Sequence, residues 1–211
     1  CTQTPTAPTS LTAKVGGNAL AGEVCSGTNV TLTAGGTISV GSLQWGTGTV
    51  GDNIIDAENG RPSITVSPTV TTTYWVRSII TEAGVCYGAT SNAKTLQVNV
   101  IPALVQPVFS KSTLTLEEGG STGTITVTSG TAGGTWTSSD PDVATVNNGT
   151  VTPEGPGTAT ITYTVSNGCE EDKTATCTVT VNAKPYYIGG RFQQNWNDGA
   201  STTNPFTYAG N

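Results

Sequence analysis

The chain has 211 residues, of which only 10% are charged, with a formal net charge of −6 and no histidine. This length accommodates two domains of about 100 residues each. The scarcity of basic residues argues against nucleic-acid binding, and the absence of histidine removes the commonest general base and metal ligand. We therefore expect a protein that is not an enzyme and that holds no metal or cofactor.

The residue types that dominate the chain predict an all-β protein. Threonine and valine are abundant, with 27 glycines and 11 prolines, which is typical of short strands joined by turns. No helical periodicity and no apolar run of the roughly 18 residues that a membrane span needs are present. Five cysteines without a Cys-x-x-Cys pair favour disulfides in an oxidising, extracytoplasmic compartment, with one cysteine left over.

Residues 1–8 are polar and contain two prolines, which predicts an extended linker. Cys1 has two interpretations. It is either the acylated first residue of a mature bacterial lipoprotein or part of the tail of a preceding module. Only the first of these would attach the chain to a membrane.

Residues 9–102 are expected to form a first β-sandwich. Apolar residues alternate with polar ones in a series of short runs, the period of a strand with one buried face. The predicted strands lie near residues 11–15, 30–34, 43–45, 64–66, 71–77 and 96–100. This number of strands suits an immunoglobulin-like sandwich.

One of these strands offers a candidate contact surface. Tyr74 and Val76 point to one face of the strand, and Trp75 and Arg77 point to the other. If Tyr74 faces the core, Trp75 is exposed and available to a glycan or protein partner. The alternative is that a neighbouring loop or module covers Trp75.

Three phrases of this region resemble a known repeat, namely VCSGTNVTLTA (24–34), LQW (43–45) and SPTVTTTYWVR (67–77). They are similar to the immunoglobulin-like modules of Bacteroidetes surface proteins. The order Cys25, Trp45, Cys86 also resembles that of antibody domains. We predict a Cys25–Cys86 disulfide, which would close a loop of about 60 residues.

A short proline-containing linker (101–107) leads into a second region, 103–183, with the same alternation along residues 158–166 and 177–182. Its central phrase is WTSSDPDVATVNNGTVTPEGPGTATI (136–161). This phrase resembles the signature of group 2 bacterial immunoglobulin-like domains, the intimin and invasin type. The resemblance implies a β-sandwich module of a bacterial surface protein without an active site. Trp136 is then expected in the core, and Asp140 and Asp142 in local backbone hydrogen bonds.

Cys169 and Cys177 lie near the ends of two consecutive strand-like runs, separated by a charged loop. A hairpin would bring them together, so we predict a Cys169–Cys177 disulfide. The alternative is a pair of free thiols, which an oxidising compartment disfavours. The acidic residues of the loop, and Glu117 with Glu118, are expected to be solvated side chains, and the alternative for them is a calcium site.

Residues 184–211 form a short aromatic segment that opens with YYIGGRF. It resembles the start of starch-binding modules in outer-membrane glycan-capture lipoproteins of gut Bacteroidetes. The resemblance marks Tyr187 and Trp196 as candidate sugar-stacking residues. The alternative is that these aromatics belong to the core of an incomplete domain or pack on the second sandwich.

Together these patterns predict two tandem immunoglobulin-like β-sandwiches with a short aromatic C-terminal segment. The expected function is a non-catalytic structural or adhesive module of a bacterial cell-surface or secreted protein, located at the outer membrane or outside the cell. Its expected partners are other modules or copies of the same protein. The alternative is a glycan-binding surface lipoprotein that uses the sandwiches as a spacer and binds polysaccharide.

Overall fold

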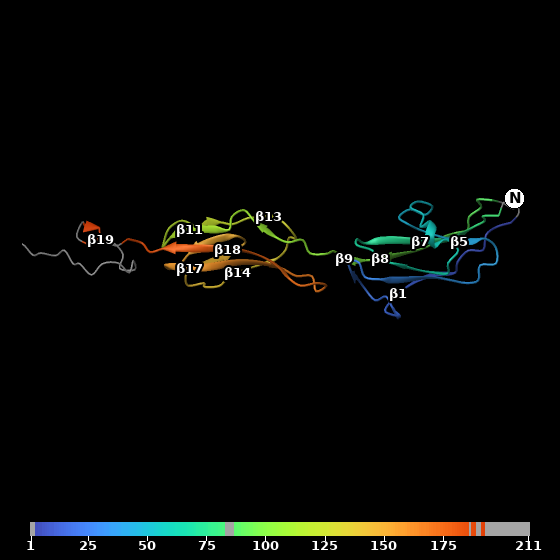
Figure 1. The fold of residues 1–211 in the computed structure, drawn as a ribbon, viewed down its shortest axis with the longest axis horizontal. Coiled ribbons are helices and arrows are strands. Elements are labelled where there is room, and N and C mark those ends of the chain that lie inside the picture. Colours follow the sequence, from blue (N-terminus) through green and yellow to red (C-terminus); the bar gives the residue numbers. More distant parts are fainter. Residues whose placement is uncertain (1–2, 83–86, 186, 189–190, 193–211) are drawn as a thin grey trace, which may run out of the picture. The chain divides into compact units, whose positions relative to one another are not determined.

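The computed structural model describes residues 3–82, 87–185, 187–188 and 191–192. The chain divides into two compact units (Figure 1). The first contains the residues up to Leu104 together with the loop Ser166–Glu171, and the second contains Val105–Val165 together with the chain from Asp172 onward. The described elements are strands apart from one short 3-10 helix, so the predicted all-β fold of two immunoglobulin-like sandwiches is confirmed.

The first unit contains two main sheets. One has the order β2-β1-β4-β6 and the other the order β5-β7-β8, while β3 pairs in parallel with β9. The bounds are β1 (Ser10–Val15), β2 (Asn18–Ala19), β3 (Val24–Cys25), β4 (Val30–Gly35), β5 (Ser42–Thr47), η1 (Asp56–Glu58), β6 (Ser63–Val66), β7 (Thr72–Ile79), β8 (Lys94–Val98) and β9 (Val100–Ile101).

The core of the first unit is built from the inward residues of both sheets. Val30 and Leu32 of β4 are fully buried, while Thr31 between them is exposed. Trp45 of β5 is the largest side chain of this core, and its indole Nε1–H donates a hydrogen bond to the carbonyl of Arg61 at 2.9 Å. This bond satisfies the one polar atom of a buried tryptophan, so burial costs no unpaired donor.

Trp75 is fully buried, so of the two interpretations left open by the sequence the covered ring is correct and the exposed contact surface is wrong. It lies on the outer face of β7, opposite Gly46 of β5, and its Nε1–H donates to the carbonyl of Thr47 at 3.2 Å. The segment after β5 turns back along that strand, since Ile55 N–H donates to the Trp45 carbonyl at 2.9 Å. The guanidinium of Arg77 lies 5.2 Å from the indole, within cation–π range.

The second unit has a four-stranded sheet, β11-β18-β17-β14, and smaller sheets β12-β16-β15 and β10-β13. β11 pairs in parallel with one edge of β18, and β17 pairs in an antiparallel manner with the other edge (Figure 1). The bounds are β10 (Val108–Phe109), β11 (Thr113–Glu117), β12 (Gly123–Thr124), β13 (Val127–Ser129), β14 (Thr135–Ser138), β15 (Ala144–Asn147), β16 (Thr150–Pro153), β17 (Gly157–Val165) and β18 (Lys173–Asn182).

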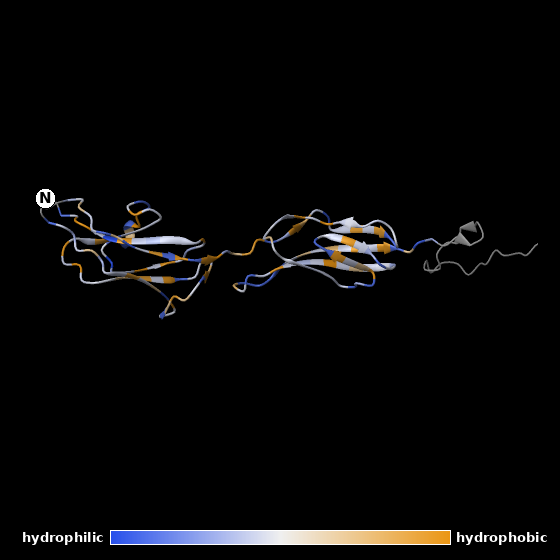
Figure 2. Cartoon of the chain, turned by 180° about the vertical axis from the view of Figure 1, so that it is seen from behind, coloured by the Kyte–Doolittle hydropathy of each residue, from blue (hydrophilic) through white to orange (hydrophobic). Residues whose placement is uncertain are grey.

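The hairpin of β17 and β18 supplies most of the second core. Along β17 the residues Ala159, Ile161, Tyr163 and Val165 are buried, and threonines fill the positions between them. Figure 2 shows this alternation as hydrophobic positions interrupted by more hydrophilic ones along the strands of this unit. The predicted period-2 pattern therefore corresponds to the two faces of the sheet.

Trp136 of β14 is half-buried and packs against this core, as predicted. Its ring stacks on Phe109 at 5.1 Å between centroids and meets Tyr163 at 5.0 Å in a tilted arrangement. The hydroxyl of Tyr163 accepts a hydrogen bond from the backbone N–H of Gly134 at 2.7 Å. The aromatic cluster thus joins β10, β14 and β17.

Two turns of the central phrase follow from their residues. Asn148 and Gly149 connect β15 to β16 with φ of 46° and 80°, the pattern of a type I′ turn, in which both central residues have positive φ. The Asp140 carboxylate accepts a hydrogen bond from Asp142 N–H at 3.1 Å, which confirms the predicted local role of Asp140.

We predict that Gly46→Ala destabilises the first unit by at least about 2 kcal/mol, in the range of overpacked cores. A Cβ atom at this position would overlap Cζ2 and Cε2 of Trp75, and Trp75 is fully buried and cannot move aside. Urea unfolding followed by tryptophan fluorescence measures the change. Gln97→Ala, an exposed position on β8 of the same sheet, is the control and should have little effect. A Gly46→Ala protein as stable as the control would contradict the packing described.

Candidate functional site

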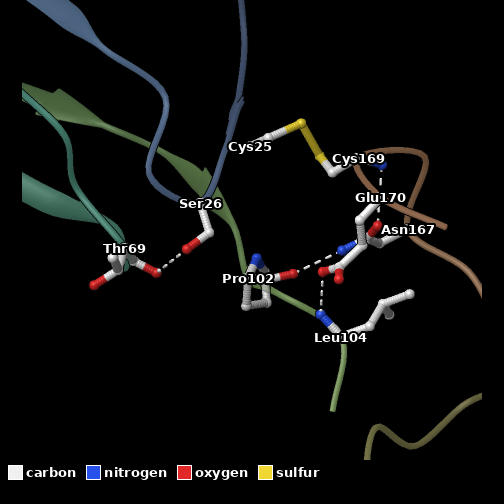
Figure 3. Close-up of a disulfide and its surroundings, with 8 residues drawn as sticks. All are labelled: Cys25, Ser26, Thr69, Pro102, Leu104, Asn167, Cys169 and Glu170. Atoms are coloured by element: carbon white, nitrogen blue, oxygen red, sulfur yellow. Dashed lines mark hydrogen bonds between the residues drawn. A yellow bond between two sulfur atoms is a disulfide. The ribbon is translucent and has the colours of Figure 1, made fainter. Parts of the chain in front are cut away.

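A disulfide between Cys25 and Cys169 is the most distinctive chemical feature of the described residues (Figure 3). The two Cα atoms are 5.5 Å apart, although 144 positions separate the residues in sequence. Cys25 belongs to β3, and Cys169 belongs to the loop Ser166–Glu171 that connects β17 to β18. Both residues lie in the first compact unit. We call this loop the anchored loop.

Backbone pairing fixes the position of Cys25. Val24 is buried in the core of the first unit, and its N–H donates to the carbonyl of Asn99 at 3.0 Å. On the other side of Cys25, the N–H of Ser26 donates to the carbonyl of Ile101, also at 3.0 Å. Because successive side chains of a strand point to opposite faces, the inward Val24 turns Cys25 away from the core.

A tight turn follows β3 and holds it in place. Gly27 has a φ of 79°, a conformation that favours glycine, and its N–H donates to the carbonyl of Pro68 at 2.9 Å. The hydroxyl of Ser26 donates to the carbonyl of Thr69 at 3.3 Å. The turn after Cys25 is therefore bonded to the connection between β6 and β7.

Side chains of the anchored loop position Cys169. The Asn167 carbonyl oxygen accepts a hydrogen bond from Cys169 N–H at 3.0 Å, an Asx-type turn, and its amide donates to the carbonyl of Pro102 at 2.7 Å. The Glu170 carboxylate accepts a hydrogen bond from the backbone N–H of Leu104 at 2.6 Å. Figure 3 shows both side chains reaching the segment that follows β9, next to the disulfide.

The site therefore combines one covalent bond with two hydrogen bonds from neighbouring loop residues. A hydrogen bond to an ionised carboxylate is worth roughly 1.5–3 kcal/mol and a neutral one about 1 kcal/mol. These two bonds hold Cys169 near β3 independently of the sulfur chemistry. The anchored loop is therefore held to the segment after β9 by specific hydrogen bonds as well as to Cys25 by the disulfide.

The partners predicted for Cys25 and for Cys169 were both wrong. Cys25 bonds Cys169, so it is not available to Cys86, which itself lies outside the described residues. Cys25 lies where β9 leaves the first sandwich, and this is where the anchored loop meets it. No local spacing in the sequence indicates a partner so distant along the chain.

Cys177 is a free, buried thiol, so the predicted Cys169–Cys177 bond was also wrong. β18 begins at Lys173, and Cys177 lies further along it, opposite Ile161. At about 3.4 Å per residue, Cys177 is on the order of 14 Å beyond the start of the strand, whereas a disulfide needs Cα atoms within about 7 Å. Burial raises the pKa of the Cys177 thiol, and the charge of Lys111 lowers it to a smaller extent.

Several carboxylates accept structural hydrogen bonds. Glu117 accepts from the amide of Asn182 at 2.9 Å, and Glu118 accepts from the backbone N–H of Lys184 at 3.1 Å. Across the described part of the chain, no group of three or more His, Cys, Asp or Glu residues could hold a metal ion. Within the same residues, no helix has the length and apolar character to cross a membrane.

The remaining predicted site residues cannot all be placed. Trp75 is buried, so it cannot serve as the exposed contact residue. Cys1 and Trp196 lie outside the described residues, as does the side chain of Tyr187. The backbone of Tyr187–Ile188 (β19) pairs in an antiparallel manner with Arg191–Phe192 (β20). Lipidation of Cys1 and glycan contact through Tyr187 or Trp196 remain predictions.

Comparison with known protein families finds a match in the second half of the chain. Residues 105–179 match the family model of the bacterial Ig-like domain (group 2). A minor capsid protein of Enterobacteria phage T3 is 43% identical over 89 residues, which is 41% of this chain. The match covers 20% of the length of that relative, so the chain spans only about a fifth of it.

Solved structures with similar folds are distant in sequence. The insect immune protein hemolin is 13% identical with a TM-score of 0.38, over 85% of this chain and 47% of hemolin. Domains 4 and 5 of the S-layer protein SbsC are 16% identical with a TM-score of 0.32, over 86% of this chain and all of that chain. Mouse cadherin-23 EC22-24 is 17% identical with a TM-score of 0.42, over 77% of this chain and 62% of that chain.

We predict that replacing either cysteine of the disulfide lowers the stability of the folded chain by a few kcal/mol. In the chain-entropy model a loop of this length contributes up to about 5 kcal/mol. Cys25→Ser, Cys169→Ser and the double variant should lose the same amount, because both residues form one bond. Urea unfolding measures the loss. Strictly additive effects would contradict a shared bond.

We also predict that Cys177 does not react with iodoacetamide in the folded protein near neutral pH. Its thiol is buried and its raised pKa keeps it protonated, whereas the thiolate is the nucleophile. In urea the same thiol should react readily. Non-reducing peptide mapping by mass spectrometry gives both results at once, because it also identifies the Cys25–Cys169 peptide. Rapid alkylation of Cys177 in the native state would contradict its burial.

Proposed function

We propose that the chain is a non-catalytic structural or adhesive part of a bacterial cell-surface or secreted protein, such as a stalk, adhesin or filament segment. The observation that carries this proposal is the match of residues 105–179 to the bacterial Ig-like domain (group 2). Such modules are typical of surface and structural proteins. The expected location is therefore the cell surface or the extracellular space.

The disulfide supports the same location. Structural disulfides form and persist in oxidising compartments and are rare in the cytosol. The bond between Cys25 and Cys169 is held in a built site with Asn167 and Glu170, which is the character of a structural cross-link. A protein that depends on this bond for stability suits an extracytoplasmic environment.

The use of carboxylates supports a structural role over a catalytic one. Glu117, Glu118, Asp140 and Glu170 each accept hydrogen bonds from groups of this chain. Their oxygen atoms hold turns, strand ends and the anchored loop. Hydrolysis of a glycoside by two carboxylates would instead need a pair facing one substrate.

A second candidate function is suggested by the phage relative. The 89-residue similarity to a minor capsid protein of Enterobacteria phage T3, at 43% identity, favours a module displayed on a virus particle. Both functions place an immunoglobulin-like module on the outside of a large assembly. They differ in whether that assembly is a cell or a capsid.

Glycan binding is the third possibility and depends on residues outside the described part of the chain. Tyr187 and Trp196 would supply the aromatic faces, because Trp75 is buried. For the structural function, the proposed partners are other modules or copies of the same protein. The outer strands of the sheets, such as β6 and β14, could pair with them through backbone hydrogen bonds.

The test is to locate the native protein. We expect immunogold labelling with an antibody against the second unit to decorate intact cells of the producing organism. Labelling of purified virus particles, with none on uninfected cells, would instead support the capsid function. Labelling seen only inside permeabilised cells would contradict both. Affinity electrophoresis in soluble starch, with Trp196→Ala as the matched variant, separates the glycan-binding alternative from the other two.

A further inference from the structure

The Cys25–Cys169 bond changes which residues carry tension when the chain is pulled. A force applied at the two ends of a chain is transmitted along the shortest covalent path. That path enters at Cys25, crosses the disulfide and leaves at Cys169, so it omits the residues between them, which span a sequence separation of 144. We propose that this disulfide is a mechanical bypass, which keeps most core strands of both sandwiches, those between residues 25 and 169, out of the load path while it is oxidised.

Most core-forming strands lie inside the bypassed span, whereas β1 and β18 lie outside it. In the first unit, β4 to β9 lie between the two cysteines, including the fully buried Trp45 and Val76. In the second unit, β10 to β17 lie between them, including Ile161. A strand inside the closed loop cannot be pulled out from the chain ends, because its two ends belong to the same covalent ring.

The strands outside the bypassed span differ in how much length they can release under force. β1 precedes Cys25 and pairs with β4 from Ser10↔Gly35 to Lys14↔Thr31, so it can be peeled from β4. Full extension of the residues up to Cys25 releases at most about 90 Å. The oxidised protein therefore has only a short length to release on its N-terminal side.

On the C-terminal side, the load follows β18. This strand begins a few residues after Cys169 and is paired on both sides, from Gly157↔Val181 to Val165↔Lys173 with β17 and in parallel with β11. A β-strand already rises about 3.3–3.4 Å per residue, close to the maximum for an extended chain. Tension along β18 therefore gains almost no length and does not require its neighbours to separate.

The contacts of the anchored loop explain why the bond forms at this place. Asn167 bonds the carbonyl of Pro102, and Glu170 bonds the N–H of Leu104, so the loop is held beside the end of β9. These hydrogen bonds can align the two sulfur atoms during folding. They cannot replace the covalent bond under load, because a hydrogen bond is far weaker than an S–S bond and can exchange with water.

The use of such a bypass rests on the proposed function as a surface stalk or adhesin, where the chain would be under tension. The mechanical property itself depends only on the covalent connection. The two ideas can therefore fail separately. If the protein were found on no surface, the proposed function would be wrong, whereas the mechanical bypass would still hold.

Single-molecule force spectroscopy on the full chain, attached through handles at its two ends, tests the proposal. Cys1 and Cys86 are first changed to serine, so that Cys25 and Cys169 are the only pair apart from the buried Cys177. Under oxidising conditions we expect no single release longer than about 100 Å, because the residues up to Cys25 extend to at most about 90 Å, and no release from the residues between Cys25 and Cys169. Adding Cys25→Ser should release a further length of about 500 Å in separate steps, from 144 residues at about 3.3–3.6 Å each.

The matched control is Cys177→Ala, which also removes one sulfur atom but leaves the disulfide in place. It should extend no further than the oxidised parent protein. Dithiothreitol should convert the parent, but not the Cys25→Ser variant, from short to long extension. An oxidised parent that extends as far as Cys25→Ser would overturn the proposal, and so would a Cys25→Ser variant that extends no further than the parent.

Discussion

The covalent bond between Cys25 and Cys169 is the constraint on which the organisation of the described chain depends. It holds a hairpin loop that is continuous with β17 and β18 of the second unit within the first compact unit. The chain therefore passes from one unit to the other three times, after Leu104, Val165 and Glu171. In an ordinary tandem array of sandwiches the chain passes from one domain to the next once, so each domain is one continuous segment. Here the cross-link makes the two domains parts of one covalent ring.

Within each unit, stability rests on burial and on hydroxyl and backbone hydrogen bonds. Threonines fill the outward positions of β17 and β18, while alanine, valine, isoleucine and tyrosine fill the inward ones. Arg61 and Glu58 form a salt bridge at 3.4 Å, and Arg61 is largely exposed. An exposed pair of this kind contributes little. A chain with so few charges depends instead on the fit of its cores, and the overlap expected between a Cβ at Gly46 and the ring of Trp75 shows how tight that fit is.

Much of the fold could be predicted from the sequence, because period-2 alternation and turn residues are local signals. The strands near Leu32, Trp45 and Ile161 and the Asn148-Gly149 turn follow from such signals. The sequence could not decide between an exposed and a covered Trp75, because alternation gives the face of a strand but not what covers it. The disulfide could not be predicted for a related reason. Its two cysteines are brought together by the Asn167 and Glu170 contacts across more than 60 positions, and pairing by proximity in sequence favours the wrong partners.

Cys177, which was wrongly predicted to pair with Cys169, shows that two cysteines of one hairpin can be in different oxidation states. Cys169 and Cys177 both lie beyond β17, yet one is in a loop and the other faces the core opposite Ile161. The loop cysteine is oxidised, and the core cysteine stays a thiol whose raised pKa follows from burial. The core thus protects the free thiol of Cys177 from exchange with the Cys25–Cys169 disulfide, since a buried, protonated sulfur cannot attack it. The proposed bypass requires a disulfide that does not exchange, and the burial of Cys177 within β18 meets that requirement.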